Sequence, residues 1–206
     1  MAHNDPRIYL ASRSPRRREL LRQIGVHHEV LLLRESGGRL DLDETPQSGE
    51  SPQAYAIRIA SAKADVGWQR VIERQIPRYV VLGADTTVTV DGEILGKPSG
   101  LNATIAMLGK LAGRSHQVLS AVALSFEARS EVLLSTSTVK FKPLSEREIH
   151  AYASSGEPFD KAGGYAIQGR AATFIEHLEG SYSGVMGLPL FETAQLLQRF
   201  NLKLFE

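Results

Sequence analysis

The order of apolar and polar positions along the chain predicts strands that alternate with helices. Short apolar runs typical of buried strands occupy residues 8–10, 29–33, 79–82 and 173–178, and two longer β-rich runs occupy residues 116–126 and 132–141. Helical spacing marks residues 14–23, 51–66, 101–111 and 145–154 and the segment after Pro189. The two longer β-rich runs are expected to pair antiparallel. The pattern therefore predicts an α/β fold with a mixed, largely central β-sheet flanked by helices.

Cap and turn residues mark where several of these elements begin and end. Ser14-Pro15 and Ser51-Pro52 each combine a helix N-cap with a proline suited to the first turn. Asp91-Gly92 between two short β-rich runs predicts a hairpin turn. Residues 34–50 are polar, with glycines and a proline, and predict a long loop. Loops of that length inside a compact domain are commonly functional.

Composition excludes several classes of protein. Of the 206 residues, 42% are hydrophobic and 23% are charged, which suits a domain with a buried core. The net charge of +1 does not favour a duplex-binding protein, so no stable nucleic-acid complex is expected. The absence of cysteine excludes disulfides, thiolate metal sites and a cysteine nucleophile. The six histidines lack H-x-x-x-H or H-x-H spacing, which argues against a zinc site.

No apolar signal-peptide core and no run long enough to span a bilayer is present. We therefore expect a cytoplasmic protein with no membrane association. No linker or internal repeat divides the chain, so residues 1–206 are expected to form one domain, with room for two lobes around a cleft.

Serines and arginines gather where the first predicted strand gives way to a helix N-terminus. Five arginines lie between Arg13 and Arg22, and Glu19 is the one acid among them. Free backbone N–H groups and the helix dipole favour an anion there, whereas they disfavour Arg16 and Arg17 unless an anion is near. Arginines on a surface helix are usually solvated, and the segment is not a standard P-loop. Of a solvated basic surface and a phosphate-binding site, the phosphate-binding site is the stronger interpretation.

Asp85 follows the apolar run at residues 79–82 and the pair Gly83-Ala84. It is expected just past the carboxyl end of that strand, where ligands bind in α/β sheets. A carboxylate there can hold Mg²⁺ or activate water, and the small residues before it let a ligand approach the backbone. The alternative is that Asp85 only caps a turn through its own backbone.

Two lysines and a glutamine in glycine-containing segments could complete a polyphosphate site. Lys97 lies between a glycine and a proline, although an exposed lysine is the ordinary interpretation. Residues 159–169 place Lys161 and Gln168 among glycines. Lys161 can neutralise phosphate, and Gln168 carries the donor and the acceptor needed to read a base edge. A purely structural hairpin turn explains this segment equally well.

Glu44 and Lys63 are weaker candidates from the sequence alone. Glu44 lies in the long polar loop, where a carboxylate is usually solvated. It can act as a metal ligand only if the loop folds over the site. Lys63 lies between two alanines on the second predicted helix, which leaves it room to lean toward a ligand, although helix lysines are mostly exposed.

Five short motifs follow one another over nearly the whole chain. They are Leu10-Ala11-Ser12-x-Ser14-Pro15-Arg16-Arg17, Gly83-Ala84-Asp85-Thr86, Gly96-Lys97-Pro98, Asp160-Lys161-Ala162-Gly163-Gly164-Tyr165 and Gly187-Leu188-Pro189-Leu190. Each is weak alone, but together and in this order they are highly specific. With them the chain resembles the Maf family, also called septum-formation inhibitor or Maf-like proteins. One departure is the segment at residues 31–38, which is longer and more glycine-rich than the family pattern and bears on the assignment of Glu44.

The resemblance implies a fold related to the inosine triphosphatases and a nucleoside triphosphate pyrophosphatase activity. Such enzymes cut between the α- and β-phosphates and release a nucleoside monophosphate and pyrophosphate. The resemblance also implies a divalent metal cofactor, Mg²⁺ or Mn²⁺, and a homodimer. The string Tyr165-Ala166-Ile167-Gln168-Gly169 is similar to that of the subgroup acting on dTTP and UTP, and differs from that of the subgroup preferring 7-methyl-GTP.

The resemblance also assigns roles to residues. Asp85 corresponds to the catalytic base, and Arg16, Thr86 and Gln168 fall on positions associated with subgroup specificity. Glu44 and Asp85 are expected to hold the metal. The expected substrate-binding residues are Ser12, Arg16, Arg17, Lys63, Thr86, Lys97, Lys161 and Gln168.

Two other functions compete with this hypothesis. One is a non-catalytic nucleotide- or nucleic-acid-binding regulator of cell division. Asp85 argues against it, because a pocket that only binds polyphosphate gains nothing from an extra carboxylate. The other is a phosphatase of sugar phosphates, against which Gln168 and its glycine-rich segment argue weakly.

Overall fold

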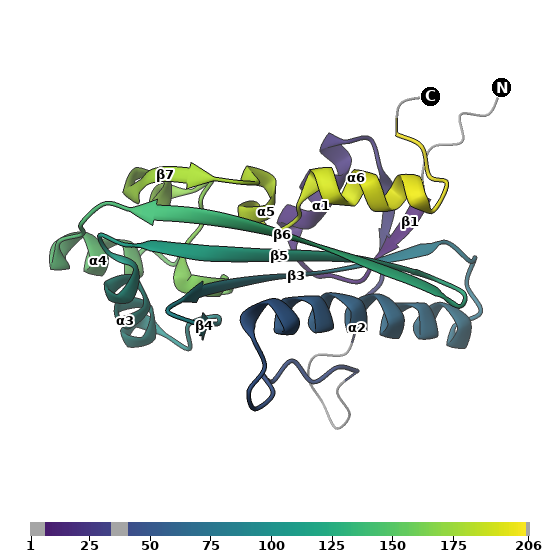
Figure 1. The fold of residues 1–206 in the computed structure, drawn as a ribbon, viewed down its shortest axis with the longest axis horizontal. Coiled ribbons are helices and arrows are strands. Elements are labelled where there is room, and N and C mark those ends of the chain that lie inside the picture. Colours follow the sequence, from purple (N-terminus) through teal and green to yellow (C-terminus); the bar gives the residue numbers. More distant parts are fainter. Residues whose placement is uncertain (1–6, 34–40, 205–206) are drawn as a thin grey trace.

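A seven-stranded mixed sheet forms the centre of the protein and runs along its longest dimension (Figure 1). The computed structural model describes residues 7–33 and 41–204. The strand order is β2-β1-β3-β5-β6-β7, and β4 pairs with β3 outside this path. β1 is parallel to β2 and β3, whereas the other pairs are antiparallel. The strands are β1 (Arg7–Leu10), β2 (His27–Val30), β3 (Val80–Val90), β4 (Glu93–Leu95), β5 (Ser115–Phe126), β6 (Arg129–Phe141) and β7 (Ile175–Glu179).

Helices cover both faces of this sheet. The long helix α2 lies along one face against β3, β5 and β6, whereas α1 and α6 pack on the other side near one end of the sheet (Figure 1). α3 and α4 pack at the other end. This confirms the predicted α/β class with a central mixed sheet. The helices are α1 (Pro15–Gln23), α2 (Pro52–Glu73), α3 (Leu101–Leu111), α4 (Glu146–Ala153), α5 (Tyr182–Met186) and α6 (Leu190–Arg199), with 3₁₀ turns η1 (Ala162–Gly164) and η2 (Arg170–Phe174). In the part of the chain just described, none of these helices is long and apolar enough to cross a membrane.

Two separate hydrophobic clusters fill the face opposite α2. One joins β1, α1 and α6 to the sheet and includes Leu82 and Leu124, and the other joins α3 and α4 to it and includes Val88 and Val118. Thr86 lies on β3 between these clusters, and alternate residues of a strand share a face. A polar position therefore separates the two apolar clusters along the central strand.

Gly83 allows α2 to lie directly on β3. A Cβ atom at Gly83 would lie 2.4 Å from the carbonyl oxygen of Ala60 and 2.4 Å from the backbone nitrogen of Ala64, so no larger residue fits unless the helix moves. The prediction that this glycine makes room for a ligand is therefore wrong, because α2 fills the space. The close approach brings Lys63 of α2 within reach of Asp85, two positions further along β3.

Several predicted elements and boundaries differ from the structure. β3 is continuous, so Asp85 lies inside this strand and not past its end. The second strand begins two residues before the predicted start, because β2 is largely exposed, and the apolar residues Leu31 and Leu33 beyond it pack under α2 instead. The segment after α4 forms 3₁₀ turns and no hairpin, and α5 was not predicted. Residues 34–40 of the predicted loop, and most of the departing segment 31–38, lie outside the described residues.

The buried side chain of His116 is expected to make the stability of the fold depend on pH. Its side chain is buried against the rings of Phe141 and Tyr165, and Nε2 lies 2.8 Å from the Tyr165 hydroxyl. Burial lowers the pKa of His116 to about 4 from 6.5. As the pH falls, His116 therefore becomes protonated in the unfolded chain before it does in the folded chain. The stability that neutral His116 contributes is full above pH 6.5 and is lost as the pH drops toward 4. Between pH 7.5 and 5, we expect this histidine to reduce the unfolding free energy by about 2 kcal/mol.

Urea unfolding of the wild type and of His116→Phe at both pH values measures this effect. The pH-dependent loss should shrink by about 2 kcal/mol in the variant, whatever its absolute stability. His177→Phe, on the exposed strand β7, is the matched control and should keep the wild-type dependence. Equal pH dependence in all three proteins would show that His116 is not the group responsible.

Candidate active site

The edge of β3 is open between two neighbouring strands. β1 pairs with β3 only as far as Leu82, and β4 pairs with it only from Val88 onward. Asp85, Thr86 and Thr87 lie between these two points. Asp85 thus lies on this unpaired edge of β3, beyond the end of β1, although β3 itself continues. The expectation of a ligand-binding crevice next to Asp85 stays a prediction.

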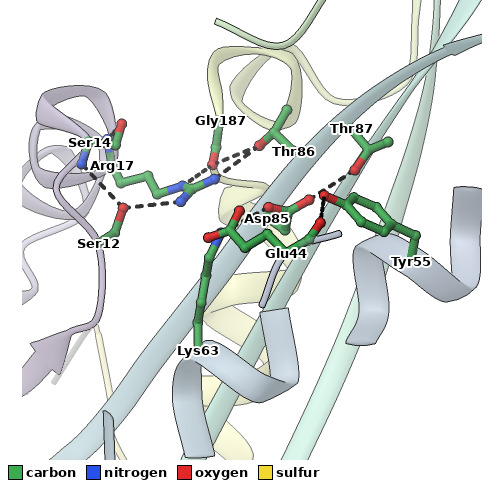
Figure 2. Close-up of polar contacts among 10 residues, drawn as sticks. All are labelled: Ser12, Ser14, Arg17, Glu44, Tyr55, Lys63, Asp85, Thr86, Thr87 and Gly187. Atoms are coloured by element: carbon green, nitrogen blue, oxygen red, sulfur yellow. Dashed lines mark hydrogen bonds and ion pairs between the residues drawn. The ribbon is translucent and has the colours of Figure 1, made fainter. Parts of the chain in front are cut away.

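The carboxylate of Asp85 is held by a donor on each oxygen (Figure 2). Lys63 Nζ lies 3.0 Å from Oδ1, and the Thr87 hydroxyl donates to Oδ2 at 2.9 Å. Thr87 is two residues further along the strand, on the same face, and is buried. Asp85 is 8% exposed, and these two contacts orient its carboxylate.

Glu44 reaches the same place from the loop before α2. Its Oε1 lies 3.2 Å from Lys63 Nζ, so this ammonium group stands between the carboxylates of Glu44 and Asp85 (Figure 2). The Tyr55 hydroxyl donates to the Glu44 carbonyl oxygen at 2.9 Å. Burial, and then the charges of Asp85 and Glu44, raise the pKa of Tyr55 to about 12. The loop therefore folds over the site, which was the condition for Glu44 to matter.

Arg17 of α1 joins three other segments: the turn after β1, β3 itself and the turn after α5. Its guanidinium donates to the carbonyl oxygen of Gly187 at 2.8 Å, to Ser12 Oγ at 3.1 Å and to Thr86 Oγ1 at 3.4 Å. Ser14 caps α1 by accepting from the Arg17 backbone N–H at 3.4 Å, as predicted. Burial lowers the pKa of Arg17 below its ordinary value, and the negative charges of Asp85 and Glu44 partly offset this. Figure 2 shows the guanidinium between Ser12 on one side and Thr86 and Gly187 on the other.

The remaining predicted residues are placed apart from this centre. Arg16 points along the outside of α1 and pairs with Glu19 at 2.8 Å. Lys97 is exposed, and Lys161 pairs with Asp160 at 2.8 Å. Gln168 is half-buried after the buried residues 165–167. Among the described residues, the polar contacts around Asp85 do not extend to these four side chains.

Two of these distant motifs nevertheless lie side by side. The backbone N–H of Gly163 donates to the carbonyl oxygen of Gly96 at 3.1 Å, which joins the loop of Lys97 to the loop of Lys161. A Cβ atom at Gly163 would lie 2.9 Å from Val88, so this pair of loops packs on β3 three residues past Asp85. The loops that carry both lysines therefore lie beside β3 near Val88.

Thr87, Tyr55 and the Gly187 carbonyl are the contributors that sequence reasoning missed. Thr87 could have been found, because a residue two positions from Asp85 on one strand shares its face. Tyr55 and Gly187 act through contacts with Glu44 and Arg17 that no local pattern shows.

Two carboxylates meeting at one cation suit a hard divalent metal. Mg²⁺ is usually bound by one or two protein carboxylates together with substrate phosphates and water, so the pair Glu44 and Asp85 fits this chemistry. No group of three or more histidine, aspartate or glutamate side chains suited to a metal occurs among residues 7–33 and 41–204. The donor set therefore fits a metal that is completed by the substrate, and does not fit a metal enclosed by protein.

The architecture is that of a known class of α/β protein. A solved structure described as the Staphylococcus aureus Ham1 protein matches 95% of this chain and 97% of its own chain, with a TM-score of 0.50 and 16% identity. At this identity the likeness shows the fold alone. The family described as Maf-like protein matches residues 7–200, and this chain belongs to that family.

Relatives that are named in detail are similar over almost their full length. A protein of Nitrosomonas europaea named dTTP/UTP pyrophosphatase is 55% identical, over 96% of this chain and 96% of its own. A protein of Aromatoleum aromaticum with the same name is 56% identical, over 95% of this chain and 96% of its own. Another from Nitrosospira multiformis is 52% identical, over 100% of both chains.

Proposed function

We propose that this protein is a nucleoside triphosphate pyrophosphatase that hydrolyses dTTP and UTP to the nucleoside monophosphate and pyrophosphate. The observation that carries the proposal is the Asp85 carboxylate at the open edge of β3, with the second carboxylate of Glu44 beside it and Lys63 and Arg17 around it. The names of relatives more than half identical over nearly the full chain support the same activity.

The charges around the open edge of β3 suit a triphosphate. Arg17 presents its guanidinium on one side of β3, and Lys63 lies on the other face beside Asp85. Lys97 and Lys161 add cations on the two joined loops further along the strand. Cations on several elements can contact several phosphates at once. Each charge-assisted bond to a phosphate is also stronger than a hydrogen bond between neutral groups. The site thus has cations for both the leaving group and the retained phosphate.

Asp85 acts as the base in this proposal. Lys63 and Thr87 orient the carboxylate, which accepts a proton from the attacking water. Water attack breaks the bond between the α-phosphoryl group and the bridging oxygen, and pyrophosphate leaves. Asp85 and Glu44 would also hold Mg²⁺ or Mn²⁺, which when bound neutralises phosphate oxygens and charge developing on the leaving group.

A regulator that only binds nucleotides is the second candidate function. The cations near the open edge of β3 suit binding alone as well as hydrolysis, whereas the two carboxylates of Glu44 and Asp85 favour chemistry. The homodimer, the cytoplasmic location and the lack of a stable nucleic-acid complex that were expected from the sequence remain parts of the proposal.

Substrate preference is expected to depend on Gln168. Uracil and thymine present a carbonyl acceptor beside the N3–H donor, and one amide side chain can answer both. Cytosine reverses this pattern, so a bound CTP would leave buried polar groups unpaired. We expect kcat/KM for CTP to be about 10–100-fold lower than for UTP and dTTP.

Pyrophosphate release from dTTP, UTP, CTP and GTP, measured with the wild type and Gln168→Glu, tests this preference. The variant should lose most of the discrimination between UTP and CTP. Gln198→Glu, on an exposed position of α6, is the control and should leave it intact. A wild type that cleaves CTP as well as UTP, or a variant with unchanged preference, would remove Gln168 from base recognition.

A further inference from the structure

The loop that carries Glu44 is held against α2 by a second set of contacts away from the site. Arg58, in the second turn of α2, bonds both oxygens of the Glu50 carboxylate, with Nε at 2.6 Å from Oε1 and Nη2 at 2.7 Å from Oε2. The same Nη2 donates to the carbonyl oxygen of Thr45 at 3.1 Å. Glu50 also accepts from the backbone N–H of Gln47 at 3.0 Å. One guanidinium thus holds both ends of the segment 45–50.

The ion pair between Arg58 and Glu50 is partly withdrawn from water, whereas the bonds to Thr45 and Gln47 are exposed. The Glu50 side chain is 8% exposed and the Arg58 side chain 27% exposed, and Arg58 holds the pKa of Glu50 at about 2. The guanidinium also lies 5.5 Å from the centre of the Tyr55 ring, whose hydroxyl bonds the Glu44 carbonyl. A bidentate pair of this kind restricts geometry more than a single charge does.

We propose that Arg58 and Glu50 form a positioning pair that holds residues 44–50 against the first turns of α2 and thereby fixes Glu44 beside Lys63 and Asp85. This inference rests on the proposed function, in which Glu44 helps to hold the divalent cation. Within the described residues, the Arg58 guanidinium bonds Glu50 and Thr45 and lies over the Tyr55 ring, and it bonds neither the Glu44 carboxylate nor Asp85. It therefore acts through the loop.

Removing Arg58 is expected to release Glu44. In Arg58→Met the carboxylate of Glu50 loses its partner, and a charge left without one in a half-buried position favours opening of the loop. Loss of groups that orient a metal ligand typically weakens metal binding about 10–100-fold. We expect Mn²⁺ alone to bind the variant about 10–100-fold more weakly, as read from free Mn²⁺ by electron paramagnetic resonance. Amide exchange in residues 43–51 of the metal-free protein should also accelerate.

Conservative variants separate positioning from general structural damage. Arg58→Lys keeps the charge but cannot reach both Glu50 oxygens and Thr45 together, so its Mn²⁺ affinity should fall between the wild type and Arg58→Met. Glu50→Gln keeps the side-chain volume and should show the same defects more mildly. It replaces Arg58→Met in the test if that variant folds poorly. Arg114→Met removes an exposed guanidinium that pairs with Asp91 and should change neither measurement.

A double-mutant cycle with Glu44→Gln decides the inference. If Arg58 acts through Glu44, Arg58→Met should add little further loss of Mn²⁺ affinity in a Glu44→Gln background. The inference is overturned, and the proposed function is not, if the fold-losses of the two single variants multiply in the double variant. The same holds if Arg58→Met binds Mn²⁺ normally while Glu44→Gln binds it more weakly. If Glu44→Gln itself binds Mn²⁺ normally, the metal role of Glu44 in the proposed function fails, and the inference fails with it.

Discussion

Asp85→Asn is expected to keep the fold and to lower kcat for dTTP by about 10²–10⁴-fold, the range typical for loss of a general base. Asparagine has nearly the same shape and can still accept from Thr87, so β3 and its pairing with β5 should be preserved. It cannot take a proton from water, and it removes one of the two charges that face Lys63. Steady-state pyrophosphate release at saturating dTTP measures the loss.

The matched control for this change is Asp91→Asn. Asp91 lies at the exposed turn after β3 and pairs with Arg114, and its positive φ of 52° is one that asparagine also tolerates. Its kcat should equal that of the wild type, and circular dichroism of both variants should match the wild-type spectrum. Near-normal turnover of a folded Asp85→Asn protein would take Asp85 out of the mechanism.

Removal of divalent metal is expected to reduce hydrolysis to the limit of detection. Two carboxylates and a triphosphate bind a hard cation only loosely, so excess EDTA should strip it, and Mg²⁺ or Mn²⁺ added above the chelator should restore activity. The thermal midpoint should fall only slightly, because loose binding stabilises little and the described residues hold no cluster that would make a metal part of the core. Full activity in excess EDTA, confirmed with metal-free buffers, would contradict the metal role of Glu44 and Asp85.

The elements that depend on local pattern could be predicted from the sequence. Ser14-Pro15 and Ser51-Pro52 begin α1 and α2 as expected, because cap and proline preferences act within one turn. The turn at Asp91-Gly92 forms because both residues adopt positive φ. The mixed sheet followed from the two long β-rich runs, which pair over their whole length. Family membership, inferred from five dispersed motifs, was also confirmed.

What could not be predicted depends on residues far apart in the sequence. The end of a strand depends on where its neighbours stop, so the continuation of β3 past Asp85 is not visible from an apolar run of residues 79–82. Gly83 was interpreted as space for a ligand, but only the packed helix shows that the space is filled. Arg16 and Arg17 are adjacent and chemically identical, and the helix turn alone directs one to Glu19 and the other to Thr86 of β3. The positions of Lys97, Lys161 and Gln168 relative to a bound nucleotide stay predictions.

Product analysis by ³¹P nuclear magnetic resonance tests the central claim most directly. The wild-type protein is incubated with dTTP and Mg²⁺ and compared with Asp85→Asn under the same conditions. The account predicts that dTMP and pyrophosphate appear in equal amounts with the wild type, that no dTDP accumulates, and that Asp85→Asn forms neither product at a comparable rate. Formation of dTDP with orthophosphate, or binding of dTTP without turnover by the folded wild type, would contradict it.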